Sequence, residues 1–209
     1  MEPETFTEKW NDFLKEIFSS DPAHYLWLRC LSYLEYIGYR KMVKTLEYQE
    51  VNQGVYHHLT DEIRHSYMLK ELAEKAFEGR FQNVLFDDSF IEIAEGYFQD
   101  VDGEVCQWIL SNNGQERPFL CYMLVSYIIE KRAMAVYPPY YSKLQEAPSK
   151  LILQKIIKDE RDHLSYLEDR LSLLPESSSF KASNLPSFEA GRFHQFLDQF
   201  RDCARPYLN

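Results

Sequence analysis

Two histidines follow a glutamate at the same short interval: Glu62 precedes His65, and Glu160 precedes His163. Residues three positions apart lie next to each other on one surface of an α-helix. Carboxylate oxygen and imidazole nitrogen are ligands that divalent transition metals accept in proteins. Each Glu-x-x-His pair therefore indicates part of a metal-binding site.

The second pair lies on a helix face that is otherwise apolar. That face reads Leu153, Ile156, Glu160, His163, Leu167, Leu171 and Leu174. Burying a charge among leucines is costly unless something pairs with it. A divalent cation is one such partner. A core salt bridge is the other, and the sequence offers Arg29, Arg40, Arg64 and Arg132 for it, although ion pairs in a dry interior are expensive.

A lone glutamate stands on the apolar face of the helix that precedes each pair. Glu35 comes 27 residues before Glu62, and Glu130 comes 30 residues before Glu160. In two antiparallel helices joined by a short turn, this spacing puts the lone glutamate level with the pair. A bundle built this way converges four carboxylates and two imidazoles, the arrangement of di-iron and di-manganese carboxylate sites. We expect two iron ions, with manganese or a mixed pair as alternatives.

The elements that must position these residues are predicted to be helices. Long stretches of 3.6-residue periodicity and only 7 glycines predict an all-α chain. We expect a single domain over residues 1–209. The core helices are expected at about 22–48, 55–78, 118–137 and 150–174. Pro138 and Pro139 should end the third of them.

The remaining segments are expected to add short or extra helices around this core. A long crossover, 80–117, should contain its own helix at about 88–111. A short amphipathic helix is expected at 5–18. Another is expected at about 188–202, packed on the outside, within a C-terminal extension of residues 175–209.

The two halves resemble the repeated motif of ferritin-like di-iron carboxylate proteins. That motif is an acidic residue followed some thirty residues later by Asp-Glu-x-Arg-His. The first copy is Glu35 with Asp61-Glu62-Ile63-Arg64-His65, and the second is Glu130 with Asp159-Glu160-Arg161-Asp162-His163. Asp162 stands where the motif has arginine. The resemblance covers the four long helices and implies a ferritin-like four-helix bundle.

The resemblance also implies a role for each matched residue. The implied metal ligands are Glu62 and Glu160 as bridging carboxylates, Glu35 and Glu130 as terminal ones, and His65 and His163 with one iron each. Asp61 and Asp159 would accept hydrogen bonds from the ligand histidines and fix their tautomers, with Arg64 beside them.

Three other residues are expected close to these ligands. His58 lies one turn before Glu62. It is either an extra ligand or proton relay, or a hydrogen-bonded core histidine, which we favour. Tyr127 lies one turn before Glu130 and Tyr166 one turn after His163. Both tyrosines are close enough to donate a hydrogen bond to the site or to carry a radical, but ordinary core packing is the interpretation we favour for each.

The motif does not specify a reaction. In size and ligand spacing the chain is similar to the stand-alone oxygenases of this fold, such as aldehyde-deformylating oxygenase or the tRNA hydroxylase. We therefore expect an oxidoreductase, an O2-activating oxidase or oxygenase acting on a small organic substrate, with an apolar one as the first hypothesis. Electrons should come from a separate donor, because no flavin, nicotinamide or iron–sulfur motif is present. A ferroxidase or iron-storage protein, and a non-catalytic metal-binding bundle, are the alternatives.

Charge and composition exclude several other classes. A net charge of -10 without a basic stripe argues against nucleic acid as a partner. The longest apolar run, about 119–129, is too short to cross a bilayer. The acidic N-terminus lacks a signal-peptide core, and the four cysteines form no Cys-x-x-Cys pair. We expect a cytoplasmic protein without a disulfide scaffold, as a monomer or a homodimer.

Overall fold

A computed structural model describes residues 6–46, 51–77, 79–81, 86–113, 118–174 and 189–208. Within these ranges the chain is all-helical, which confirms the predicted fold class. Its helices are α1 (Phe6–Ser19), α2 (Asp21–Leu46), α3 (Gln53–Ala76), α4 (Asp88–Asn113), α5 (Pro118–Lys143), α6 (Ala147–Ser172), α7 (Glu189–Ala204) and a 3-10 helix (Arg205–Tyr207). None of the described helices has the length and apolarity that crossing a membrane requires.

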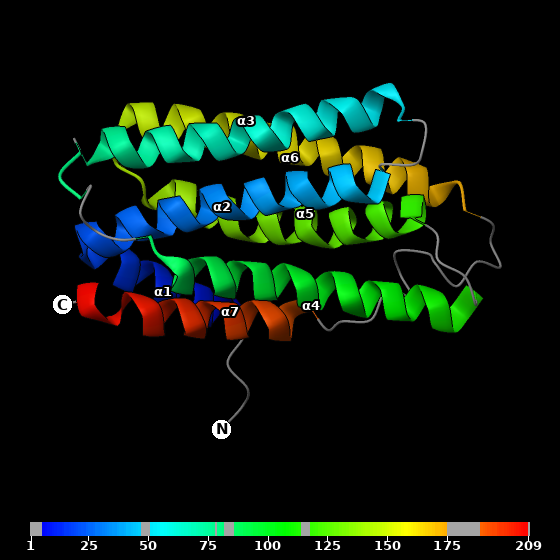
Figure 1. Cartoon of the computed structure of the whole chain (residues 1–209). Coiled ribbons are helices and arrows are strands. Elements are labelled where there is room, and N and C mark those ends of the chain that lie inside the picture. The colour runs from blue at the N-terminus through cyan, green and yellow to red at the C-terminus, as the bar shows by residue number, and fades with distance from the viewer. Residues whose placement is uncertain are drawn as a thin grey trace.

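Four long helices form a ring in which each packs against two others. Helix α2 contacts α3 and α5, and α6 contacts the same two helices from the opposite corner. Figure 1 shows this ring as two layers, α3 with α6 above α2 with α5. Because the side chains that face the centre of the ring come from all four helices, this centre is where the predicted ligands should meet.

The crossover helix α4 covers one side of the ring. It packs against α2 and α5, and with α7 it makes a third layer (Figure 1). Its apolar face is buried: Phe90, Ala94, Tyr97, Phe98, Val101, Val105 and Ile109 are at most 6% exposed. A fully buried side chain of this size stabilises the fold by roughly 1.5–3 kcal/mol. The crossover is therefore an integral layer of the core.

The terminal helices α1 and α7 contact each other at the same end of the molecule. Helix α7 lies in the outer layer, as expected, and buries Phe193, Phe196, Leu197 and Phe200. Phe13 of α1 meets the Phe200 ring edge-on, with 5.6 Å between ring centroids. Residues 175–188 of the expected C-terminal extension lie outside the described ranges.

The predicted end of the third core helix is wrong. Helix α5 continues through Pro138 and Pro139 to Lys143. Each proline removes one helical N–H donor and normally breaks a helix. Here the helix beyond the prolines buries Tyr140, which is 0% exposed. The apolar area gained by this ring offsets part of the loss of hydrogen bonds, a tertiary effect that helix propensity alone does not include.

A close contact sets the alignment of α3 with α6. The Asn52 side chain caps α3 by accepting a hydrogen bond from the Val55 N–H at 3.2 Å. The same oxygen accepts the Tyr166 hydroxyl of α6 at 3.1 Å. A Cβ atom on Gly54 would lie only 2.6 Å from the Tyr166 ring. Glycine is thus required for α6 to approach the start of α3, and this approach helps to hold the two Glu-x-x-His pairs level.

Candidate metal centre

Seven ionisable side chains meet in the centre of the ring. They are Glu35 of α2, His58, Glu62 and His65 of α3, Glu130 of α5, and Glu160 and His163 of α6. All seven are at most 9% exposed. Their ligand atoms form two groups, His58–Glu62–Glu130–His163 and Glu35–Glu62–His65–Glu160, each with all four atoms within 4.8 Å of one another. The structure therefore brings together all six predicted ligands, and it adds His58.

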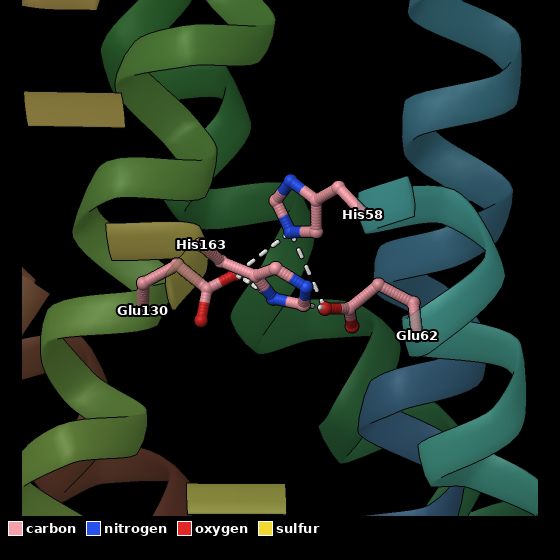
Figure 2. A group of neighbouring side chains, drawn as sticks. All are labelled: His58, Glu62, Glu130 and His163. Carbon is pink, nitrogen blue, oxygen red and sulfur yellow. Dashed lines mark hydrogen bonds and ion pairs between the residues drawn. The ribbon is translucent and has the colours of Figure 1, made fainter. Parts of the chain in front are cut away.

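In the first group two imidazoles and two carboxylates surround one point (Figure 2). His58 Nε2 lies 2.8 Å from Glu130 Oε1 and 3.3 Å from Glu62 Oε1. His163 Nδ1 lies 3.7 Å from each of those two oxygens. The rings of His58 and His163 are 4.2 Å apart between centroids. Four candidate donor atoms from three helices thus lie within 4.8 Å of one another.

The second group contains two orphaned atoms. His65 Nδ1 and Glu160 Oε1 are 2.9 Å apart. In the described part of the chain neither has a partner in hydrogen-bond geometry, although both are buried. Two atoms bound to one metal at about 2.1 Å and at right angles would be separated by roughly 3 Å. This close but non-hydrogen-bonding approach is what a shared metal ion requires of its ligands.

Two carboxylates touch both groups. Glu62 belongs to each of them. Glu160 reaches His65 through one oxygen and His163 through the other, with Oε2 at 3.1 Å from His163 Nδ1. These are the two residues expected to bridge the metals, and their positions suit that role.

The outer nitrogens of two histidines are held by aspartates. His163 Nε2 lies 3.1 Å from Asp61 Oδ2, and His65 Nε2 lies 3.2 Å from Asp159 Oδ2. Each aspartate therefore serves the histidine of the other Glu-x-x-His pair. An Nε2–H that donates to a carboxylate leaves Nδ1 as the lone-pair atom, and in both histidines Nδ1 points to the central carboxylates.

One guanidinium supports both aspartates. Arg64 Nη2 lies 2.8 Å from Asp159 Oδ2 and also forms an ion pair with Asp61. Lys155 adds a second cation, at 3.1 Å from Asp159. Asp162, where the motif has arginine, has a side chain that is 66% exposed. The departure from the motif thus lies on the surface, and Arg64 and Lys155 supply the positive charge from other positions.

Two tyrosines that sequence analysis did not single out contact the inner ligands. The Tyr122 hydroxyl lies 3.0 Å from His58 Nδ1, and the Tyr137 hydroxyl donates to Glu35 Oε1. Both come from α5, eight residues before and seven residues after Glu130. That spacing places them on the same face of the helix as Glu130. This shared face was the signal that could have found them.

The tyrosines expected near the site have their contacts elsewhere. Lys131 covers the Tyr127 ring, with Nζ 5.3 Å from the ring centroid. Tyr166 donates its hydroxyl to Asn52. Tyr166 therefore acts on helix alignment, and Tyr127 is a buried packing residue at 8% exposure.

The arginines considered as core partners form their ion pairs outside the central cluster. Arg64 pairs with Asp61 and Asp159. Arg29 pairs with Glu74, Arg40 with Glu95 and Arg132 with Glu189. In the described ranges, every ion pair of Glu62, Glu130 and Glu160 is with a histidine. The four central carboxylates are thus not neutralised by lysine or arginine there.

Burial and crowding raise the pKa values of two of these carboxylates, Glu35 and Glu130. Burial, followed by the charges of Glu62 and Glu160, raises the pKa of Glu35 well above its usual range. Burial and Glu160 also raise the pKa of Glu130 to about 7. The pKa rises because the charged forms repel one another where water cannot screen them. A cation bound between the carboxylates would relieve this repulsion.

The carboxylates around the histidines raise the pKa values of the imidazoles, and so favour their charged form. Burial on its own lowers the pKa of His58, but hydrogen bonds to Glu130 and Glu62 outweigh it and raise the pKa to about 9. For His65, burial is likewise outweighed by the charge of Glu160, and the pKa rises to about 9. The site therefore favours positive charge at its centre, either as protons on imidazole or as a metal.

Cavities adjoin the centre on two sides. A surface pocket of about 580 Å³ lies between α2, α4 and α5. It shares Lys41, Thr45, Asp102 and Cys121 with a smaller inner cavity of about 30 Å³, which His58, Glu62 and Glu130 also line. On the far side, an apolar space of about 60 Å³ touches Glu35, Glu62, Glu130 and Glu160. These four shared residues form the wall between the outer pocket and the inner cavity, called the neck below.

Comparison with protein-family models, with curated proteins and with solved structures gave no match for this chain. At the level that the structure establishes, the protein is an all-helical bundle with a buried cluster of histidine and glutamate that could hold metal ions.

Proposed function

We propose that the chain is a ferritin-like di-iron carboxylate protein that activates O2 and oxidises a small organic substrate. One observation carries this proposal: four buried glutamates and three histidines converge in two groups that share Glu62. The four negative charges balance two divalent ions. The ring of α2, α3, α5 and α6, with α4 in the crossover, supports the ferritin-like assignment.

The donor set suits iron or manganese. His58, Glu62, Glu130 and His163 would hold one ion, and Glu35, Glu62, His65 and Glu160 the other. Carboxylate oxygen with one or two imidazoles per metal is the ligand chemistry of non-haem iron and manganese. The groups contain no thiolate, which would favour zinc or copper(I). His58 is thus proposed as a seventh ligand, in addition to the six that the motif supplies.

A bound di-iron pair would supply the binding and reduction of O2, with electrons from a separate donor. The protein's own residues would prepare the ligands. Asp61 and Asp159 hold His163 and His65 in the tautomer that leaves Nδ1 free. Tyr137 holds Glu35 in place through its hydroxyl. Apolar walls around the centre limit water, which strengthens every electrostatic contact there.

The outer pocket is the proposed entrance for the substrate. Its volume of about 580 Å³ lies within the range of small-molecule sites, which is roughly 300–1,000 Å³. Ile37 and Ile109 provide apolar wall, and Lys41 and Asp102 form an ion pair at the neck, 3.0 Å apart. These features fit a small organic molecule with an apolar part. They fit a fatty chain less well, because such a chain would need a long apolar tunnel.

Metal analysis tests the proposal directly. Protein produced with iron should contain about two metal ions per chain, the number held by carboxylate-bridged bundle sites. The double variant Glu62→Ala/Glu160→Ala should lose most of this metal. The control is Asp162→Asn, which removes an exposed carboxylate from the same helix and should keep it. Circular dichroism would establish that each variant is helical.

Oxygen consumption separates the enzyme from a mere metal-binding bundle. Iron-loaded protein with a chemical reductant should consume O2 faster than the metal-poor double variant. Less than about one metal ion per chain, with no change in the double variant, would refute the di-iron assignment. Full metal loading without O2 consumption would support the metal site and refute the assignment as an oxidase or oxygenase.

A further inference from the structure

Two cysteines from different helices meet in the wall of the outer pocket. Cys106 of α4 and Cys121 of α5 have their sulfur atoms 3.1 Å apart. A disulfide bond is about 2.05 Å long, so an approach of roughly 1 Å would join them. Sequence spacing gave no sign of this pair, because the two residues are brought together only by the packing of α4 on α5.

The two sulfurs differ in access. Cys106 is half-buried, whereas Cys121 is buried, and both line the 580 Å³ pocket. Cys121 also lines the inner cavity that reaches His58, Glu62 and Glu130. The hydrogen bond with Cys106, burial and the nearby Asp102 raise the pKa of Cys121. Cys106 is therefore the sulfur that meets a reagent from the pocket, and Cys121 is the one placed to resolve the product.

We propose that Cys106 and Cys121 form a reversible disulfide that ties α4 to α5 at the neck of this pocket, oxidised by a peroxide and re-reduced by a small-molecule thiol. This inference does not depend on the proposed di-iron chemistry. The pocket admits both reagents, since it is open at the surface and about 580 Å³ in volume.

The chemistry balances with hydrogen peroxide as the oxidant. The Cys106 thiolate attacks one peroxide oxygen, the O–O bond breaks, and one water leaves after protonation. The resulting sulfenic acid on Cys106 is attacked by the Cys121 sulfur, which forms the S–S bond and releases a second water. Two thiols and one H2O2 thus give one disulfide and two waters. Two molecules of a small thiol then return the pair to the dithiol by exchange, and they leave as their own disulfide.

A metal ion held by Asp102, Cys106 and Cys121 is the competing assignment, since these three residues also form a ligand group. Two thiolates on one zinc ion, with bonds of about 2.3 Å, would lie roughly 3.8 Å apart. The observed 3.1 Å is shorter. Asp102 is moreover engaged with Lys41 at 3.0 Å. The geometry therefore favours the disulfide.

Peptide mapping tests the proposal. The full chain is treated with hydrogen peroxide, blocked with a thiol reagent and digested after glutamate under non-reducing conditions. Cleavage after Glu104, Glu116 and Glu130 separates the two cysteines into peptides 105–116 and 117–130. We expect these peptides to appear covalently joined, about 2 Da lighter than their sum. Added glutathione should separate them again.

Variants identify the sulfurs concerned. Because Cys106 is only half-buried, the Cys106→Ser variant should fold. The joined peptide should be absent from this variant. Cys203→Ser is the matched control, since it removes another half-buried thiol and should leave the joined peptide unchanged. The proposal is overturned if the peptides stay separate while Cys203 is fully oxidised. Zinc that co-purifies with the wild type and is lost in Cys106→Ser, without any joined peptide, would instead support the metal assignment.

Discussion

His58 gives the centre a seventh candidate ligand atom. Its Nε2 is 2.8 Å from Glu130, and its Nδ1 contacts Tyr122 at 3.0 Å. At 2% exposure its side chain is almost completely buried. A histidine held by its outer nitrogen and facing two carboxylates with its inner nitrogen has the arrangement of a metal ligand.

The neighbouring residue offers a matched comparison. His57→Ala removes an exposed imidazole and should not change metal binding. His58→Ala should lower the affinity for one of the two metal ions by about tenfold or more. Loss of a residue that only orients a metal ligand already lowers metal affinity by roughly 10–100-fold. Titration of metal-free protein with Mn(II) or Co(II), followed by equilibrium dialysis, measures both sites. Two equally tight ions in His58→Ala would contradict the assignment of His58 as a ligand.

Which residues meet at the centre was predictable where the signal was local. Glu62 with His65 share one helix turn, so residue type and spacing were sufficient to place them together. The contacts of His58 were not predictable from spacing, because they include Glu130, which is 72 positions away. The motif departure at Asp162 also became clear only in three dimensions, where Arg64 serves both aspartates.

At the scale of the helices, α2 comes close to the central carboxylates at Gly38, which has no side chain. A Cβ on Gly38 would lie 3.4 Å from Glu62 Oε2 and 3.8 Å from the Phe98 ring. These are ordinary contact distances, so alanine fits, but a larger side chain would compete with the Glu62 carboxylate. Gly38 thus leaves room for the carboxylate that both ligand groups share.

Substitution of glycine by leucine on two helices tests this point. Gly38→Leu should displace Glu62 and lower the metal content. Gly103→Leu on α4 is the control, because a Cβ there meets nothing within 4 Å. The control should keep its metal and gain up to about 1 kcal/mol of stability from better helix propensity. Metal analysis and thermal unfolding of both variants provide the measurement, and equal metal contents would show that Gly38 leaves no necessary space.

Helix positions were predictable from the sequence, and helix ends less so. Periodicity gave the interiors of α2, α3, α4 and α6 within a few residues. The continuation of α5 through Pro138 and Pro139 was missed, since the burial of Tyr140 beyond the prolines is visible only in the packed structure. How the helices pack into layers, and hence the pocket between α2, α4 and α5, is not contained in any single helix pattern.

For the whole molecule, metal binding should contribute to folding. The ligands come from four helices, so the unfolded chain has no preformed site. A metal at a free concentration of 100 times its Kd stabilises the folded state by about 2.7 kcal/mol. A chelator should therefore lower the Tm of the wild type.

The double variant Glu62→Ala/Glu160→Ala provides the reference for this experiment. Since its site has lost the shared carboxylates, the chelator should leave its Tm unchanged. An identical drop in both proteins would mean that the chelator acts elsewhere, and that the four-helix ring does not depend on its centre.

The two candidate metal positions, which share Glu62, are unequal. The group with His58 and His163 carries two carboxylates, whereas the group with His65 carries three. A first dication therefore meets a charge of -3 in one position and -2 in the other, and it should bind at the more anionic position. There it takes up part of the negative charge of Glu62. The second ion then binds at a less anionic position with more nitrogen. Loading should proceed in order, and a cell that offers two different metals could fill the pair with one of each.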